Sequence, residues 1–152
     1  MDKLKMKIVI ADNNKDFCNI LNEYLSYQED IVVTGIANDG VEALKLIEEK
    51  KPDLVLLDII MPIMGGFDVL ERLNATYSYP APRIIVLSAI NQKKIIKKAI
   101  SLGADYYVVK PFEIEVLIEK IKQMLNITTC SDNIKKPINN IYKTSQLVAI
   151  IA

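Results

Sequence analysis

The stretch Leu54–Pro62, LVLLDIIMP, gives the first indication of the fold. Its first four residues form an uninterrupted apolar run, which is typical of a strand buried on both faces of a parallel sheet. The run stops at a carboxylate, Asp58. Parallel sheets that are covered by helices carry their functional sites at the carboxyl ends of the strands. Asp58 therefore stands where a functional side chain is expected in such a fold.

Similar apolar runs lie on both sides of this stretch and alternate with amphipathic segments. The predicted strands are Lys7–Ala11, Ile31–Ala37, Leu54–Leu57, Arg83–Leu87 and Tyr106–Val109. Apolar residues at helical spacing predict helices within 17–25, 39–51, 66–74, 91–102 and 114–125. Asp39 and Glu42 have the spacing of a capping box at the start of the second helix. Five strand–helix units in alternation predict an α/β fold, with a five-stranded parallel sheet and helices on both faces.

Four of the predicted strands lead into a polar side chain at their carboxyl end: Asp12, Asp58, Ser88 and Lys110. In a parallel sheet these ends share one edge, so the four side chains are expected to lie together. Carboxylates can hold Mg²⁺, and one of them can serve as a nucleophile. An ammonium group and a hydroxyl can neutralise charge on a phosphoryl group. A single such residue is usually a cap or a turn residue, but four in register indicate a phosphoryl-transfer site.

The composition narrows the possible functions. The chain has 152 residues, two cysteines and no histidine, which excludes Cys/His zinc sites and catalytic triads with a histidine base. Cys18 is expected to be a core residue of the first helix. Nineteen basic and nineteen acidic residues give no charge signal for nucleic acid or membrane. No apolar run reaches about 18 residues and no signal peptide is evident, which favours a cytoplasmic protein.

The segments LVLLDIIMP, VLSA and YYVVKPF resemble, in order and spacing, the signature segments of response-regulator receiver domains. The resemblance covers residues 5 to about 126. It implies a flavodoxin-like, doubly wound domain that takes a phosphoryl group from a phosphohistidine onto an aspartate, with Mg²⁺ required. The implied partners are a histidine kinase or histidine phosphotransferase, and a second copy of the chain after phosphorylation. Such a domain is not a conventional enzyme, because it catalyses only its own phosphorylation and dephosphorylation.

The resemblance also implies roles for individual residues. Asp58 would accept the phosphoryl group, and Lys110 would pair with a phosphate oxygen. Ser88 would be the switch hydroxyl that moves to meet the phosphate. Tyr107 would be the switch aromatic residue, three positions before the lysine. Pro111 would follow a cis peptide bond.

The metal ligands implied by the resemblance are Asp12, Asn13, Asp58 and the backbone carbonyl of Ile60. The family usually has two adjacent acidic residues where this chain has Asp12 and Asn13. The asparagine keeps a carbonyl oxygen for Mg²⁺, but the loss of one negative charge weakens the attraction for the ion. A milder departure is Gly65–Gly66, whose first position is often acidic in the family.

A narrower resemblance concerns the segments IADNN, YQED, LVLLDIIMP and VLERL. They are similar to the receiver halves of the master sporulation regulators of endospore-forming bacteria. This implies transcriptional control of sporulation, with DNA bound only through an output domain. Residues 1–126 are predicted to be the receiver domain. Residues 127–152 are predicted to be a linker or tail that leads toward an output domain that is absent from this chain or truncated.

Two other functions compete with the phosphorylated switch. A pseudo-receiver would act as a protein–protein interaction module without phosphorylation, and Asn13 motivates this alternative. An aspartate-nucleophile phosphatase would use the same residue types, but it normally has a second Asp two residues after the nucleophile, where this chain has Ile60. Nucleotide binding is disfavoured because the sequence has no glycine-rich phosphate loop.

Overall fold

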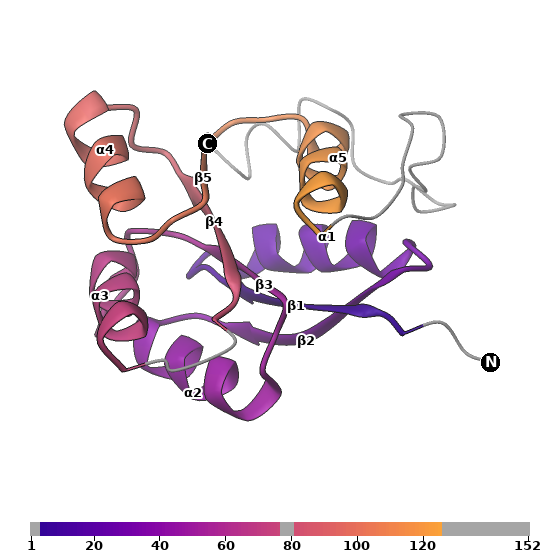
Figure 1. Ribbon diagram of the computed structural model, residues 1–152. Helices are drawn as coiled ribbons and strands as arrows, with labels where there is room; N and C mark the ends of the chain where they lie inside the picture. The colour runs from indigo at the N-terminus through magenta and orange to yellow at the C-terminus, as the bar shows by residue number, and fades with distance from the viewer. Residues whose placement is uncertain (1–3, 77–80, 126–152) are drawn as a thin grey trace.

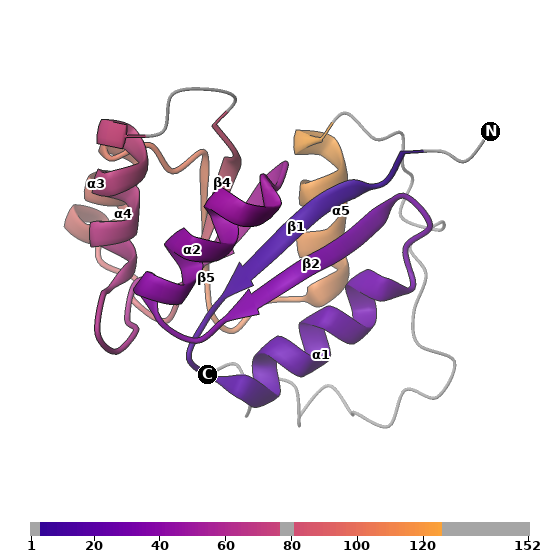
Figure 2. The same ribbon diagram turned by 90° about the horizontal axis from the view of Figure 1, so that it is seen from below.

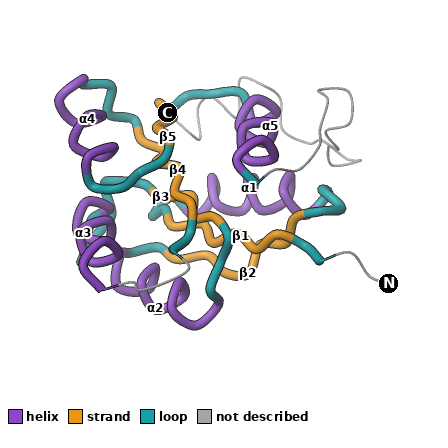
Figure 3. The backbone as a smooth tube through the Cα atoms, viewed as in Figure 1, coloured by secondary structure: helices purple, strands orange, loops and turns teal. Residues whose placement is uncertain are grey.

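The computed structural model describes residues 4–76 and 81–125, in which five strands and five helices alternate along the chain (Figure 1). The strands are β1 (Met6–Ala11), β2 (Ile31–Ala37), β3 (Leu54–Leu57), β4 (Arg83–Ser88) and β5 (Tyr106–Val109). The helices are α1 (Lys15–Ser26), α2 (Gly40–Lys50), α3 (Gly66–Thr76), α4 (Lys93–Ser101) and α5 (Ile114–Met124). Figure 3 shows the same alternation by colour, with a loop between each strand and the helix that follows it.

The five strands form one parallel sheet in the order β2-β1-β3-β4-β5. The chain moves outward from β1 to β2, then returns past β1 to place β3, β4 and β5 on the other side. The direction of strand order therefore reverses between β1 and β3, which is where ligands bind in open α/β sheets. The predicted fold class is confirmed.

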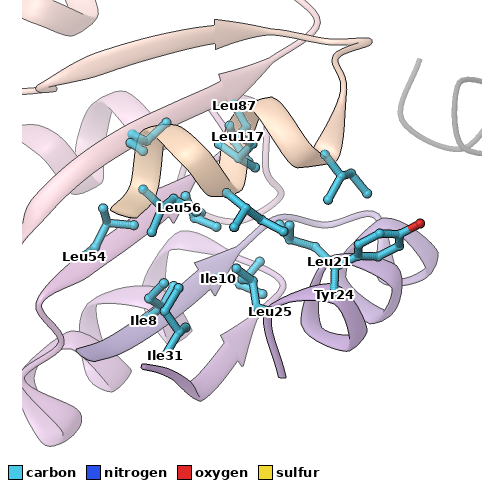
Figure 4. Close-up of a cluster of buried hydrophobic side chains, with 14 of the residues drawn as sticks. Ile8, Ile10, Leu21, Tyr24, Leu25, Ile31, Leu54, Leu56, Leu87 and Leu117 are labelled. Atoms are coloured by element: carbon cyan, nitrogen blue, oxygen red, sulfur yellow. The ribbon is translucent and has the colours of Figure 1, made fainter. Parts of the chain in front are cut away.

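The helices cover both faces of the sheet (Figures 1 and 2). Helices α1 and α5 pack on one face, where Phe17, Leu21 and Leu117 belong to a buried cluster with side chains of the sheet. Figure 4 shows part of this cluster, in which Ile8, Ile10, Leu54 and Leu56 meet the α1 and α5 side chains. Helices α2, α3 and α4 bury a second cluster on the other face. Alternate residues of β1 and β3 enter opposite clusters, so both strands are buried on both sides.

The predicted start of α2 is confirmed in part, and the predicted start of α4 is wrong. The Asp39 carboxylate accepts a hydrogen bond from the Glu42 N–H at 2.8 Å, as a capping box requires. The Glu42 carboxylate, however, accepts from the Asn38 N–H at 3.2 Å rather than from the cap residue. Helix α4 begins at Lys93 instead of Asn91, because the Gln92 carbonyl accepts the first helical N–H groups.

Three further predictions concern the burial of Cys18, membrane-spanning segments and the tail at 127–152. Cys18 is fully buried in the core, as predicted, and burial raises the pKa of its thiol to about 12. None of the described helices is both long enough and apolar enough to cross a membrane. The predicted linker or tail at 127–152, with Cys130, lies outside the described residues.

Candidate functional site

The sheet brings the ends of β1, β3, β4 and β5 together at one edge. Ala11 of β1 pairs with Leu57 of β3, so Asp12 and Asp58 follow side by side. The Asp58 N–H donates to the Ala11 carbonyl at 2.9 Å, which continues the ladder by one step. On the other side, the Lys110 N–H donates to the Ser88 carbonyl at 2.8 Å. The structure thus places all four predicted strand-end residues at the same edge.

Asp58 is buried and is held through one of its two carboxylate oxygens. Oδ1 accepts the N–H of Ile59 at 2.7 Å and, more weakly, that of Ile60 at 3.4 Å. Oδ2 lies 3.7 Å from the Lys110 ammonium group. The pKa of Asp58 is raised from 3.8 to about 6. Loss of solvation and, after it, the nearby Asp12 charge raise the pKa, while Lys110 and the backbone N–H groups of Ile60 and Ile59 lower it. One oxygen of Asp58 is therefore anchored by the backbone, and the other faces the cation.

Lys110 pairs more closely with Asp12 than with Asp58. Its Nζ lies 2.6 Å from Asp12 Oδ2, and both side chains are almost completely buried. The other carboxylate oxygen of Asp12 accepts the N–H of Asn14 at 2.9 Å. Charge-assisted contacts of this kind are strong where water is excluded. The ammonium group therefore rests between the two carboxylates, on the Asp12 side.

Two side chains that sequence reasoning did not assign to the site hold the backbone of Asp12. The Asn38 side-chain amide, from the loop between β2 and α2, donates to the Asp12 carbonyl at 2.9 Å. The Cys18 thiol donates to the same oxygen at 3.3 Å. Asn14, which was also missed, caps α1 by accepting the Phe17 N–H at 3.1 Å. Only the cap had a sequence signal, because asparagine before a helical segment favours this position.

Ser88 and Tyr107 both contact the loop that joins β4 to α4. The Ser88 hydroxyl oxygen accepts the Ile90 N–H at 3.2 Å, and the Tyr107 hydroxyl donates to the Ile90 carbonyl at 2.7 Å. Burial raises the pKa of Tyr107 above its ordinary value. Tyr107 thus already points its hydroxyl toward this loop. Its role as a switch and that of Ser88 stay predictions.

The candidate metal ligands are all oxygen atoms, which is the kind of ligand that Mg²⁺ prefers. Within the described residues there is no group of three or more His, Cys, Asp or Glu side chains that could hold a metal. The available set is two carboxylates, Asp12 and Asp58, with the amide oxygen of Asn13 and the carbonyl of Ile60. Mg²⁺ usually takes one or two carboxylates and keeps several waters. Asn13 is exposed, and Ile60 is 61% exposed. The side chain of Ile60 has no metal-binding atom, so its contribution would be the backbone carbonyl.

The loop after Asp58 requires a glycine at position 66. A Cβ atom there would lie 2.3 Å from the Asp58 carbonyl oxygen, far inside contact distance. At Gly65 a Cβ atom would lie 3.0 Å from the Ile59 carbonyl, which is tight but less severe. Ile63 in the same loop has a φ of 70°, which is rare for a β-branched residue. The backbone of this loop is therefore pressed against the carbonyl of the candidate acceptor. The Lys110–Pro111 peptide bond beside it is cis, as the resemblance implied.

Comparison with known proteins identifies the family. The family model described as "Response regulator receiver domain" matches residues 8–122. The chain therefore belongs to the response regulator receiver family. Receiver domains are phospho-accepting signalling modules of two-component systems rather than conventional enzymes, and this decides against the phosphatase alternative. They receive their phosphoryl group from histidine kinases and bind Mg²⁺ for this reaction.

Solved structures show the same fold. The signal receiver domain of NarL from Mycobacterium tuberculosis is 27% identical with a TM-score of 0.76, and the match covers 82% of this chain and 98% of that one. A two-component response regulator from Clostridium difficile is 31% identical with a TM-score of 0.72, covering 80% and 97%. CheY from Borrelia burgdorferi, in a complex with CheX, BeF3 and Mg²⁺, is 23% identical with a TM-score of 0.72, covering 80% and 90%.

Proposed function

We propose that Asp58 is the phospho-acceptor of this receiver domain. The supporting observation is its asymmetric carboxylate, with Oδ1 bound to backbone N–H groups and Oδ2 facing Lys110. Oδ2 would attack the phosphorus atom of a phosphohistidine on a histidine kinase or histidine phosphotransferase. The new O–P bond forms as the P–N bond breaks, and the electron pair of that bond leaves with the donor imidazole. Lys110 would neutralise charge on the transferred group.

Asp12, Asp58, the Asn13 amide oxygen and the Ile60 carbonyl would hold the magnesium ion. The bound ion would supply positive charge to the phosphoryl oxygens. Lys110 would have to share Asp12 with the ion, because its ammonium group lies 2.6 Å from that carboxylate. The site therefore has two carboxylates and one lysine, where most relatives would have a third carboxylate.

Ser88 and Tyr107 would convert phosphorylation of Asp58 into a changed surface. Ser88 is the last residue of β4, and its hydroxyl would reach a phosphoryl oxygen through a movement of this strand end and the following loop toward Asp58. The Tyr107 hydroxyl donates a hydrogen bond to the Ile90 carbonyl in that same loop, so the position of the Tyr107 ring would depend on the position of the loop. The negative charge added by phosphorylation of Asp58 would thus change the positions of side chains on β5 and α4.

The surface formed by α4, β5 and α5 would then bind a second copy of the chain. It carries exposed apolar side chains at Ile100, Tyr106 and Val116, and β5 is the last strand of the described sheet. Four exposed lysines, at positions 93, 94, 97 and 98, lie on α4. A groove of about 520 Å³ between β5 and α5 is lined by two acidic side chains, Glu113 and Glu119, and by one basic side chain, Lys120. In a two-fold dimer, the basic helix of each copy could face the two glutamates of the other copy's groove.

A role in transcriptional control of sporulation is the finer part of this proposal. Its support is the similarity of IADNN, YQED, LVLLDIIMP and VLERL to sporulation regulators. DNA would be bound through an output domain and not through the receiver domain itself. Phosphorylation would act on that domain by bringing two copies together, which raises their effective concentration on paired DNA sites.

A phosphorylation-independent pseudo-receiver is the second candidate. Asn13 favours it, because the acidic pocket has one charge less than is usual in the family. The buried pair of Asp12 and Lys110 favours it too, since this pair leaves a stable pocket without any added ion. In that case the same surface would bind a partner constitutively.

Intact mass after incubation with acetyl phosphate and Mg²⁺ separates the two candidates. The wild type should gain about 80 Da, the mass of one phosphoryl group, and Asp58→Asn should gain nothing because it lacks the nucleophile. In the source organism, the same variant should prevent the formation of heat-resistant spores. An adduct on Asp58→Asn would refute the acceptor assignment, and an unmodified wild type would favour the pseudo-receiver. Normal spore counts would refute only the sporulation role.

A further inference from the structure

The ammonium group of Lys110 has a third neighbour besides the two carboxylates. Its Nζ lies 4.5 Å from the centroid of the Phe17 ring. The lysine side chain is 7% exposed and Phe17 is fully buried, so water is largely excluded around this contact. A cation over the face of an aromatic ring is attracted by the ring quadrupole, and the attraction grows when the cation is desolvated.

The Phe17 ring is itself held from two directions. Phe17 lies in the first turn of α1, where its N–H donates to the Asn14 side chain that caps the helix. Phe112, from the loop between β5 and α5, packs against it with ring centroids 6.0 Å apart and ring planes at 83°. This is the edge-to-face arrangement that aromatic pairs favour. The ring therefore presents a fixed face to the ammonium group.

We propose that Phe17 is a positioning residue for Lys110, a role that rests on the proposed transfer to Asp58. The ring face attracts the ammonium group in addition to the two carboxylates. It offers no hydrogen-bond acceptor that would compete with a phosphoryl oxygen. The ring would therefore hold the ammonium group within reach of both Asp12 and Asp58 without occupying its hydrogen bonds. An aliphatic side chain would also pack against the lysine, but it would lack the attraction of the ring quadrupole for the cation.

Fluorinated phenylalanines at position 17 of the full chain test this role, because they keep the ring shape and weaken its negative face step by step. We would incorporate phenylalanine with one, two and three ring fluorines. One measured quantity is the rate of phosphoryl uptake from acetyl phosphate with Mg²⁺, which should fall stepwise by about tenfold across the series. The same series at Phe112 is the matched control. Phe112 contacts the Phe17 ring, but the Lys110 ammonium group lies over Phe17, so fluorination at position 112 should have a much smaller effect on the rate.

The second measured quantity is the urea midpoint of unfolding without a phosphodonor. It is measured for the position-17 series in two backgrounds, the wild type and Lys110→Met. Methionine keeps much of the side-chain length but has no charge. Fluorination at position 17 should lower the midpoint of the wild-type background relative to Lys110→Met, since only the former has a cation over the ring. Equal changes in both backgrounds would overturn the assignment, because the ring would then act through packing alone.

The two measurements also separate this inference from the proposed function. Normal phosphoryl uptake without a fluorine trend would overturn the role of Phe17 and leave Asp58 as the acceptor. A wild type that takes up no phosphoryl group would overturn the role in transfer together with the proposed function. A decline in both uptake and relative midpoint, confined to position 17 and to chains with Lys110, is the result that supports the proposal.

Discussion

The raised pKa of Asp58 makes the free energy of unfolding depend on pH in the absence of Mg²⁺. The pKa of this carboxyl rises from 3.8 to about 6, mainly because burial disfavours the charged form. Protonated Asp58 therefore favours the folded state. This contribution is fully present below about pH 4 and is lost as the pH rises through about 6.

Replacing Asp58 by asparagine should remove that pH dependence. Relative to the wild type, Asp58→Asn should gain roughly 1–3 kcal/mol of unfolding free energy between pH 4 and pH 7.5. Urea unfolding of both proteins at the two pH values, without divalent ions, measures the difference. Because other titrating groups are common to both proteins, they largely cancel. A difference that does not change with pH would contradict the raised pKa.

Asn13 is the second residue whose chemistry can be tested alone. Asn13→Asp would restore the acidic pair beside Asp58, and Mg²⁺ favours anionic oxygen ligands. Because the position is exposed, we expect only about a three- to tenfold increase in Mg²⁺ affinity. Calorimetric titration with Mg²⁺ measures it. Asn19→Asp, which adds the same charge at an exposed position farther along α1, is the matched control. Equal affinities for wild type and Asn13→Asp would show that position 13 lies outside the reach of the ion.

At the scale of elements, β5 is tied to the loop between β4 and α4 by one side chain. The Tyr107 hydroxyl donates to the Ile90 carbonyl at 2.7 Å, and the Ser88 hydroxyl accepts the Ile90 N–H. Tyr107→Phe keeps the ring but removes the donor. Amide hydrogen exchange should therefore rise in this loop, by about three- to tenfold for a bond of about 1 kcal/mol.

The exchange measurement has an internal control in the same sample. Amides of β1 and β3, which lie at the centre of the sheet, should keep their protection. A uniform increase over the whole chain would mean that the variant is globally destabilised. No increase at residues 89–92 would show that the hydroxyl does not hold the loop.

At the scale of the whole molecule, the proposed output is self-association. Beryllofluoride mimics a phosphoryl group on an aspartate, so adding it with Mg²⁺ should shift the chain from monomer to dimer. Sedimentation at tens of micromolar would measure the shift. Lys97→Glu, at an exposed position of α4, should reverse the shift by placing a negative charge opposite the glutamates of the groove. Lys45→Glu, exposed on α2, is the matched charge control and should dimerise normally.

A monomer under both conditions would refute the dimer for this chain. The acceptor role of Asp58 would then be judged by the mass measurement alone. Dimerisation that survives Lys97→Glu would place the interface on a different surface. Loss of dimerisation in both charge variants would point to net charge rather than to a specific contact.

The sequence by itself determined the order of the elements and the strand ends that meet. Continuous apolar runs such as Leu54–Leu57 can be satisfied only by burial on both faces, which requires a parallel sheet between helices. The residues that follow such strands then share an edge. This is why Asp12, Asp58, Ser88 and Lys110 could be placed together without coordinates.

Only the tertiary structure decided how these side chains are held. Lys110 lies 98 residues from Asp12 along the chain, and Asn38 lies 26 residues from it. Contacts over such separations depend on loop backbones and side-chain rotamers, which local periodicity does not fix. The helical spacing of Phe17 correctly predicted a buried residue, but it carried no sign of the ammonium group over the ring. The sheet edge was therefore predictable because strand burial imposes it, and the pairing within the site was not, because it arises where distant loops meet.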